Sequence, residues 1–186
     1  MQKIIMILTD GFEEIEAVTV SDVMRRLGFD FVFAALEQPR LRASNGLNII
    51  ADTTLDRCSP ADFDAVVLPG GMPNAMKLRA SSAVIDFLVE MNRRGKIVAA
   101  ICAAPIVLAK AGLLENRTFT LYPGLDPYLD GKIPSSASVE TDGNIVTGKG
   151  PGVSFQFASA LASALGVSTD PLYSQMFLLS LREKRK

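Results

Sequence analysis

The sequence KIVAAICAAP, residues 96–105, joins a buried β strand to a helix and decides the fold. Residues 96–101 are mostly apolar, which predicts a strand inside a sheet. Ala103-Ala104-Pro105 opens a helix that continues to residue 111 and is closed by Gly112. An apolar strand that runs directly into a helix is typical of a parallel α/β sheet.

The rest of the chain repeats this alternation of short apolar strands and helices. Strands are predicted over 3–9, 31–35, 65–68 and 118–121, and helices over 13–27, 82–93, 151–165 and 171–182. Two hairpins are predicted, 41–43 with 47–50 and 139–141 with 145–147, around turns that contain Asn-Gly and Asp-Gly. We therefore expect an α/β fold, a flavodoxin-like three-layer α/β/α sandwich with a mostly parallel sheet, in a single domain over residues 1–186.

Histidine is absent from the 186 residues, and this excludes several classes of site. A Cys-His or Ser-His triad cannot form within one chain, and neither can a metal site with histidine ligands. Cys58 and Cys102 lie far apart in sequence, among unclustered carboxylates, so we expect no metal and no cofactor. Two such cysteines favour free thiols in a reducing compartment, which indicates a cytoplasmic protein.

The charge and hydropathy of the chain argue against two kinds of partner. The formal net charge is −1, so there is no basic field to attract nucleic acid. No apolar run approaches the ~18 residues of a membrane span, and the first ten residues are too short and too soon charged for a signal peptide. The basic segment 181–186 is expected to be a frayed, solvated end.

Cys102 stands where chemistry is expected in such a fold. In doubly wound sheets, ligands bind beyond the carboxyl ends of the parallel strands, which here gather the segments after residues 9, 68, 101 and 121. A residue at a strand-to-helix junction is forced into a sharp turn that projects its side chain into the crevice. A small buried core cysteine is the alternative, and the position favours function.

Glu16 is predicted to face the same crevice. Its helix has an apolar stripe at Val20, Val23, Met24 and Leu27, and one turn back along this stripe lies Glu16, followed by Glu13. Glu14 falls on the polar face, where it complements the helix dipole. A partly buried carboxyl favours its protonated form, so Glu16 could donate a hydrogen bond to a thiolate or accept its proton.

Backbone groups and loops complete the predicted site. Gly70 and Gly71 follow a core strand, and with Ala103 they could direct N–H groups toward a ligand as an oxyanion hole. A plain turn is the alternative reading of the two glycines. The segment 148–152, which contains Gly150 and Pro151, is a weak nucleotide signature and is interpreted as a pocket wall. Cys58 lies in a loop without a nearby acid-base partner and is interpreted as incidental.

Four motifs together resemble the DJ-1 branch of the ThiJ/PfpI superfamily. They are GFEEIEAV (11–18), VVLPGG (66–71), AAICAAP (99–105) and GPGVSFQFA (150–158), in the family's order and across nearly the whole chain. The resemblance implies a flavodoxin-like homodimer and an oxidation-sensitive Cys102 that is hydrogen-bonded by a protonated Glu16, with backbone N–H groups from Gly70 and Gly71. It also implies cofactor-free glyoxalase, deglycase or redox-sensitive chaperone activity.

Two positions depart from the family pattern. Tyr122 stands where the human member has a histidine near the cysteine, and Asn45 stands where it has an arginine in the loop that borders the site. The cysteine and the glutamate match, so the core mechanism is retained, while the outer pocket differs and leaves the substrate open. Members that act as proteases use a histidine beside the cysteine, and this chain has none.

Two functions from different classes follow. The first is an enzyme that acts on methylglyoxal-like aldehydes or glycated adducts, with Cys102 as the nucleophile and Glu16 as the proton shuttle. The second is a redox-responsive chaperone or oxidative-stress sensor that works through oxidation of Cys102. A Cys-acid hydratase or amidase stays open as a third. Since Ile15 lies off the apolar stripe of its helix, we also expect a homodimer.

The ionisation of the site completes the expectations. We expect the pKa of Cys102 below its usual value, because a helix N-terminus and backbone N–H groups favour a thiolate. We expect the pKa of Glu16 above its usual value, because burial and an adjacent thiolate both oppose a second negative charge.

Overall fold

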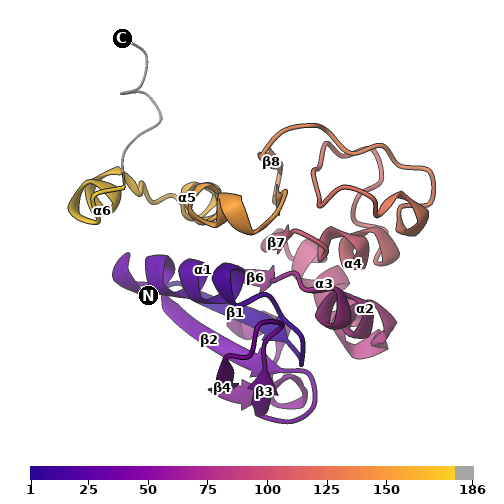
Figure 1. The fold of residues 1–186 in the computed structure, drawn as a ribbon, viewed down its shortest axis with the longest axis horizontal. Coiled ribbons are helices and arrows are strands. Elements are labelled where there is room, and N and C mark those ends of the chain that lie inside the picture. The colour runs from indigo at the N-terminus through magenta and orange to yellow at the C-terminus, as the bar shows by residue number, and fades with distance from the viewer. Residues whose placement is uncertain (179–186) are drawn as a thin grey trace.

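A seven-stranded sheet in the order β5-β2-β1-β6-β7-β9-β8 forms the centre of the computed structural model, which describes residues 1–178 (Figure 1). Every neighbouring pair in this sheet is parallel except β8 with β9. The strands are β1 (Lys3–Leu8), β2 (Asp30–Ala35), β5 (Thr53–Thr54), β6 (Ala65–Leu68), β7 (Ile97–Ile101), β8 (Val139–Asp142) and β9 (Ile145–Gly148). The predicted mostly parallel sheet is confirmed.

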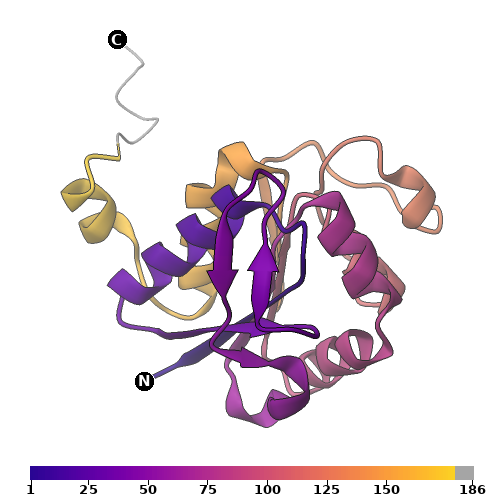
Figure 2. The same cartoon turned by 60° about the horizontal axis from the view of Figure 1, so that its bottom comes forward.

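Helices cover both faces of the sheet and make the sandwich three-layered (Figures 1 and 2). Helices α1 (Glu14–Arg26) and α5 (Ser154–Ala164) pack on one face, and their buried residues share a core cluster with Met6, Val67 and Ala99. Helices α2 (Met72–Ala80), α3 (Ser82–Arg93) and α4 (Pro105–Lys110) cover the other face. Because both faces are buried, the central strands are almost entirely apolar, as the sequence indicated.

The hairpin predicted near residue 45 stands apart from the main sheet. Strands β3 (Arg40–Arg42) and β4 (Asn48–Ile50) pair with each other antiparallel, with Leu41 opposite Ile49. The loop between them reaches back to the first turn of α1, where the Asn45 N–H donates to Glu14. The hairpin is therefore tied to the end of the sheet at which α1 begins (Figure 2).

Three predicted elements differ from the structure. Residues 118–121 form no strand, because β9 occupies the place beside β7 and the Thr120 N–H donates to the Thr147 side chain instead. The helix predicted from residue 151 begins with a 3₁₀ turn at Pro151–Val153 before α5. The last predicted helix, 171–182, is only α6 (Asp170–Gln175) within the described part.

Residues 179–186 lie outside the described part of the chain, and with them the end of that predicted helix and the basic segment 181–186. Helix α2 was not predicted from the sequence. No helix among residues 1–178 is long and apolar enough to cross a membrane.

Candidate active site

The carboxyl ends of β1, β6 and β7 meet at one edge of the sheet, since the three strands are parallel neighbours. Cys102 follows β7 directly, the Gly70-Gly71 turn follows β6, and Glu16 lies on the helix that follows β1. Three segments far apart in sequence therefore deliver a thiol, two backbone N–H groups and a carboxyl to the same place.

Cys102 adopts a backbone conformation that non-glycine residues rarely adopt. Its φ is +62°, in the left-handed region, which costs an L-residue on the order of 1–3 kcal/mol. The surroundings hold this conformation, because the Cys102 N–H donates to Gly148 O at 2.8 Å and Cys102 O accepts from the Tyr122 N–H at 2.9 Å. The predicted sharp turn is present, and it directs the thiol toward Glu16 and Gly70.

Glu16 is completely buried, and only one of its carboxyl oxygens has an ordinary hydrogen bond. The Gly70 N–H donates to Oε2 at 2.6 Å. Oε1 has no partner of ordinary hydrogen-bond geometry among residues 1–178. An ionised carboxylate with one unsatisfied oxygen in an apolar interior is costly, so this geometry favours the neutral acid.

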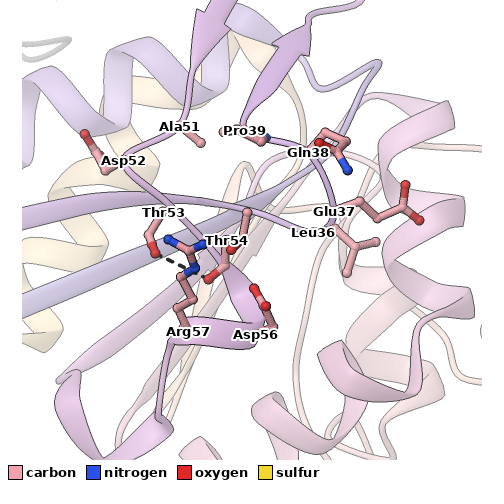
Figure 3. Close-up of a pocket in the computed structure, with 10 residues that line it drawn as sticks. All are labelled: Leu36, Glu37, Gln38, Pro39, Ala51, Asp52, Thr53, Thr54, Asp56 and Arg57. Carbon is pink, nitrogen blue, oxygen red and sulfur yellow. Dashed lines mark hydrogen bonds between the residues drawn. The ribbon is translucent and has the colours of Figure 1, made fainter.

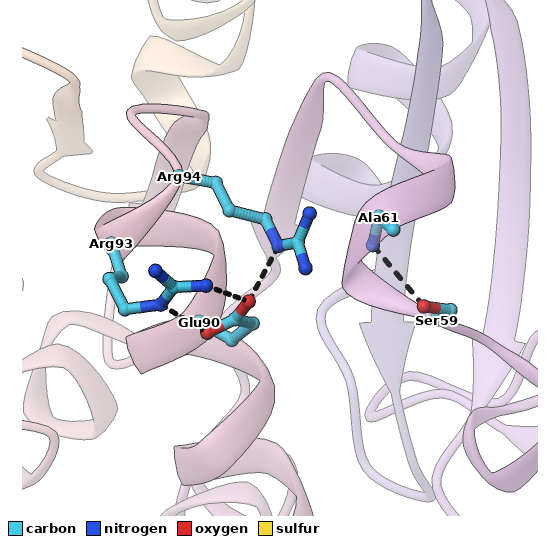
Figure 4. Close-up of polar contacts among 5 residues, drawn as sticks. All are labelled: Ser59, Ala61, Glu90, Arg93 and Arg94. Atoms are coloured by element: carbon cyan, nitrogen blue, oxygen red, sulfur yellow. Dashed lines mark hydrogen bonds and ion pairs between the residues drawn. The ribbon is translucent and has the colours of Figure 1, made fainter.

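The pKa of Glu16 is raised to about 7, and burial is the main cause. The N–H of Gly70 and the contact with Cys102 oppose this shift, while the charge of Glu13 adds to it. Glu90 is the contrasting case at the surface, where hydrogen bonds from Arg93 and Arg94 lower its pKa to about 2 (Figure 4). The predicted direction for Glu16 is confirmed.

The expected direction for the thiol is wrong. The pKa of Cys102 is raised to about 12, first by burial and then by the charge of Glu16 and its contact with the thiol. The N–H groups of Ala103 and Gly71 oppose the shift without reversing it. Because thiol and carboxyl interact directly, a charge on one opposes ionisation of the other, and the pair loses its first proton near pH 7.

Helix geometry explains part of this error. Helix α4 begins only at Pro105 and is six residues long, so Cys102 lies three residues before it, and the Ala103 N–H is the nearest donor from that side. A short helix that starts beyond the thiol offers less of the dipole effect on which the expectation relied.

Gly70 and Gly71 have different roles in the structure. The N–H groups of Gly71 and Ala103 act on the Cys102 thiol and oppose its raised pKa, whereas the Gly70 N–H donates to Glu16 Oε2. Gly70 is therefore an anchor for the carboxyl and does not belong with the donors around the sulfur. A Cβ at Gly70 would lie 2.6 Å from the Cys102 Cβ, so only glycine fits between thiol and carboxyl.

The predicted outer residues Asn45, Tyr122, Gly150 and Pro151 do not all lie together. The Tyr122 ring is about half exposed, and its Cδ2 lies 3.4 Å from where a Cβ of Gly150 would be, so these two residues share one wall. Asn45 directs its N–H and amide to Glu14, at 3.0–3.2 Å. Among residues 1–178, no hydrogen bond links Asn45 or Pro151 to Cys102 or Glu16.

A separate hollow of about 540 Å³ lies beyond the end of β2, beside the edge strand β5 (Figure 3). Glu37, Asp52, Asp56 and Arg57 supply its charged side chains, and no residue of the candidate site lines it. The described residues also contain no group of three or more His, Cys, Asp or Glu side chains placed to hold a metal ion.

One buried polar residue beside the site was not singled out from the sequence. Asn74 lies in α2, is completely buried, and forms hydrogen bonds to the backbone around Gly70. The sequence could have pointed to Asn74 as a polar residue at an inward-facing position of a helix. It did not, because α2 itself was not predicted.

Comparison with known proteins agrees with this arrangement. The model of the DJ-1/PfpI family matches residues 2–164. The chain belongs to the DJ-1/PfpI family. The resemblance of its four sequence motifs is thereby confirmed, with the cysteine and the acid of those motifs in direct interaction in the structure.

Relatives and solved structures cover most of the chain. Protein dj-1beta of Drosophila melanogaster is 37% identical over 87% of this chain and 88% of its own length. A deglycase of Pyrococcus horikoshii is 30% identical over 80% of this chain and 90% of its own length. A glutathione-independent glyoxalase of Caenorhabditis elegans is 29% identical over 87% of this chain and 87% of its own length. The structure of oxidised DJ-1 of Toxoplasma gondii superposes with a TM-score of 0.89 at 30% identity, covering 95% of this chain and 98% of that one.

Proposed function

We propose that this member of the DJ-1/PfpI family is a cofactor-free enzyme of the glyoxalase or deglycase type. Its substrates would be methylglyoxal-like aldehydes or the early adducts that such aldehydes form. The observation that carries the proposal is the partly buried thiol of Cys102 beside the buried carboxyl of Glu16, whose pKa is raised to about 7. The names of the Pyrococcus and Caenorhabditis relatives support the class of reaction.

The pair can carry out the full conversion of methylglyoxal to lactate. The Cys102 thiolate adds to the aldehyde carbon and forms a C–S bond, and the resulting alkoxide takes the proton of Glu16 to give a hemithioacetal. Glu16, now ionised, removes the proton from C1 and returns it at C2, while the proton of the C1 hydroxyl passes to the C2 oxygen, and the hemithioacetal becomes a lactoyl thioester. Water then cleaves the C–S bond, releases lactate and restores the thiol.

The backbone donors suit the charges that appear along this path. The N–H groups of Gly71 and Ala103 act on the sulfur and can stabilise the oxyanion that develops next to it. Gly70 keeps the carboxyl oriented through its N–H bond to Oε2.

The direct test is release of D- or L-lactate from methylglyoxal. The wild-type protein and the Cys58→Ala variant should form lactate at rates within about twofold of each other, while Cys102→Ala should fall to the uncatalysed background, because the nucleophile is lost. A wild-type rate no higher than that of Cys102→Ala would contradict the proposed function.

Oxidation of Cys102 is the second candidate function. Gly71 and Ala103 direct N–H groups at the sulfur, where they could bind sulfinate oxygens, and a DJ-1 of known structure has been solved in an oxidised form. In a redox sensor or chaperone, mild peroxide should add two oxygen atoms to Cys102 before Cys58 reacts. Intact-mass and peptide mass spectrometry measure this order, and equal oxidation of both thiols would contradict a sensing role.

A homodimer in the cytoplasm is the remaining part of the proposal. Ile15 and Val18 are about half exposed on α1, and Ile50 is 70% exposed on the neighbouring hairpin. Apolar side chains exposed together favour a partner surface, for which a second copy of the chain is the simplest occupant. Analytical sedimentation should give about twice the chain mass of 20.0 kDa, and a mass near 20.0 kDa at micromolar concentration would contradict the dimer.

A further inference from the structure

Asn74 is a completely buried amide with a hydrogen bond at each of its polar atoms. Its Nδ2 donates to Pro69 O at 2.7 Å and to Gly70 O at 3.1 Å. Its Oδ1 accepts from the Thr9 N–H at 2.8 Å. A single side chain thus joins the end of β1 to the turn after β6, at the edge of the sheet where Cys102 and Glu16 meet.

The two carbonyls that Asn74 holds belong to the peptide units that serve the site. Pro69 O shares its peptide plane with the Gly70 N–H, which donates to Glu16 Oε2 at 2.6 Å. Gly70 O shares its plane with the Gly71 N–H, which acts on the Cys102 thiol and opposes its raised pKa. The chain contains no cis peptide among its described residues, so each N–H points away from the carbonyl of its own unit.

We propose that Asn74 is a positioning residue, which holds two successive peptide carbonyls from behind and thereby aims the Gly70 and Gly71 N–H groups at Glu16 and Cys102. This inference rests on the pair named in the proposed function. Donation to a carbonyl also polarises its peptide unit, so that the N–H on the far side becomes a stronger donor. Asn74 acts through the backbone and touches neither the thiol nor the carboxyl.

The need for such a clamp follows from the glycines themselves. Gly71 has a φ of +87°, and a Cβ there would lie 2.1 Å from Gly11 O, so no side chain can fix this turn from within. Glycine also has the largest conformational freedom to lose. Gly70 O has a second donor in the Glu13 N–H at 3.1 Å, whereas Asn74 binds both carbonyls and so fixes the two planes relative to each other.

The test is the pH dependence of Cys102 alkylation by iodoacetamide, in a Cys58→Ala background. In Asn74→Ala the Gly70 and Gly71 N–H groups are no longer held toward Glu16 and Cys102. The midpoint of the alkylation curve should therefore move upward by about one pH unit, which lowers the rate at pH 7 roughly fivefold. Asn74→Ser keeps one possible donor and should shift less. Glu13 is the further charged group that acts on Glu16, and it is unchanged in all variants.

Asn144→Ala is the matched control. The Asn144 amide donates to Lys96 O at 2.8 Å and to Asn92 at 3.0 Å, at the opposite end of β7, so its loss removes comparable bonds far from the thiol. This control should lower the thermal midpoint of unfolding and leave the alkylation midpoint unchanged. If Asn74→Ala does not fold, Asn74→Ser decides the question in the same assay.

Two results would overturn the inference. The first is a folded Asn74 variant with the wild-type alkylation midpoint, and the second is an equal shift in Asn144→Ala, which would show a general effect of destabilisation. Neither result depends on turnover, so an inactive wild-type protein would refute the proposed function and leave this inference standing. Likewise, lactate formation with an unshifted Asn74 variant would refute this inference alone.

Discussion

The two cysteines of the chain lie in regions that differ in almost every physical respect. Cys102 has a left-handed backbone conformation and contacts a buried acid and two N–H groups. Cys58 has an ordinary extended backbone between two 3₁₀ turns, the second of which is capped by Ser59 (Figure 4), and its thiol donates to Thr54 O at 3.5 Å. Cys58 also lines an apolar hollow of about 360 Å³.

The comparison shows that a lowered thiol pKa is not what distinguishes the candidate nucleophile. Burial is the largest cause that raises the pKa of both thiols. What Cys102 has and Cys58 lacks is a second protonation site in contact with the sulfur, so that the pair can change charge near neutral pH while the thiol alone would not. Reactivity is thus predicted to be a property of the pair.

The largest expected effect concerns turnover. Glu16→Gln keeps a hydrogen-bond donor beside the sulfur and removes the titratable proton, so kcat for lactate formation should fall by at least ~100-fold. Glu13→Gln is the control, since Glu13 is partly exposed at the start of the same helix. Steady-state kinetics measure both, and similar losses in the two variants would show that Glu16 has no special role.

A smaller effect is expected on the pH dependence of stability. The pKa of Glu16 is about 7 when folded and about 4.5 in its unperturbed state, so folding favours the protonated acid. Its contribution is fully present below pH 4.5 and is lost as the pH rises to about 7, by roughly 3 kcal/mol. Glu16→Gln should lack this loss in urea unfolding from pH 4 to 8. If the free energy of unfolding changed with pH in the same way in the wild type and in Glu16→Gln, Glu16 would not be a buried acid with a raised pKa.

The smallest of these effects concerns the space between thiol and carboxyl. A Cβ at Gly70 would meet Cys102 Cβ at 2.6 Å and Glu16 Oε2 at 2.7 Å, so Gly70→Ala should destabilise the fold by about 1–3 kcal/mol. Gly152→Ala, where nothing lies within 4 Å, should cost less than about 1 kcal/mol. Urea unfolding compares the two, and equal values would mean that the site is looser than the structure shows.

Much of the fold could be predicted from the sequence, because the central strands and the larger helices carry continuous or periodic apolar patterns. The failures have local causes. Residues 118–121 alternate like a strand, but β9 takes the place beside β7. Helix α2 starts within Met72-Pro73-Asn74, directly after two glycines, where the residue types indicate a loop.

The site was predictable where position alone decides it. Cys102 lies at the end of a core strand and Glu16 on an apolar stripe, and both signals are visible in the sequence. The separate roles of Gly70 and Gly71, the clamp at Asn74 and the raised thiol pKa depend on burial and on contacts between distant segments, such as the bond between Glu16 and Gly70, which are 54 positions apart in sequence. No local pattern contains that information.

The most direct measurement is the alkylation rate of Cys102 against pH in three proteins that lack Cys58: the parent, Glu16→Gln and Glu16→Leu. The parent curve should have its midpoint near pH 7, where the pair loses its first proton. Both variants remove the second protonation site and leave a partly buried thiol, so their midpoints should move upward by at least about one unit, and Glu16→Leu should move furthest because it also lacks a hydrogen-bond donor to the thiolate. Three superimposable curves would show that Glu16 does not act on Cys102, and would contradict the account.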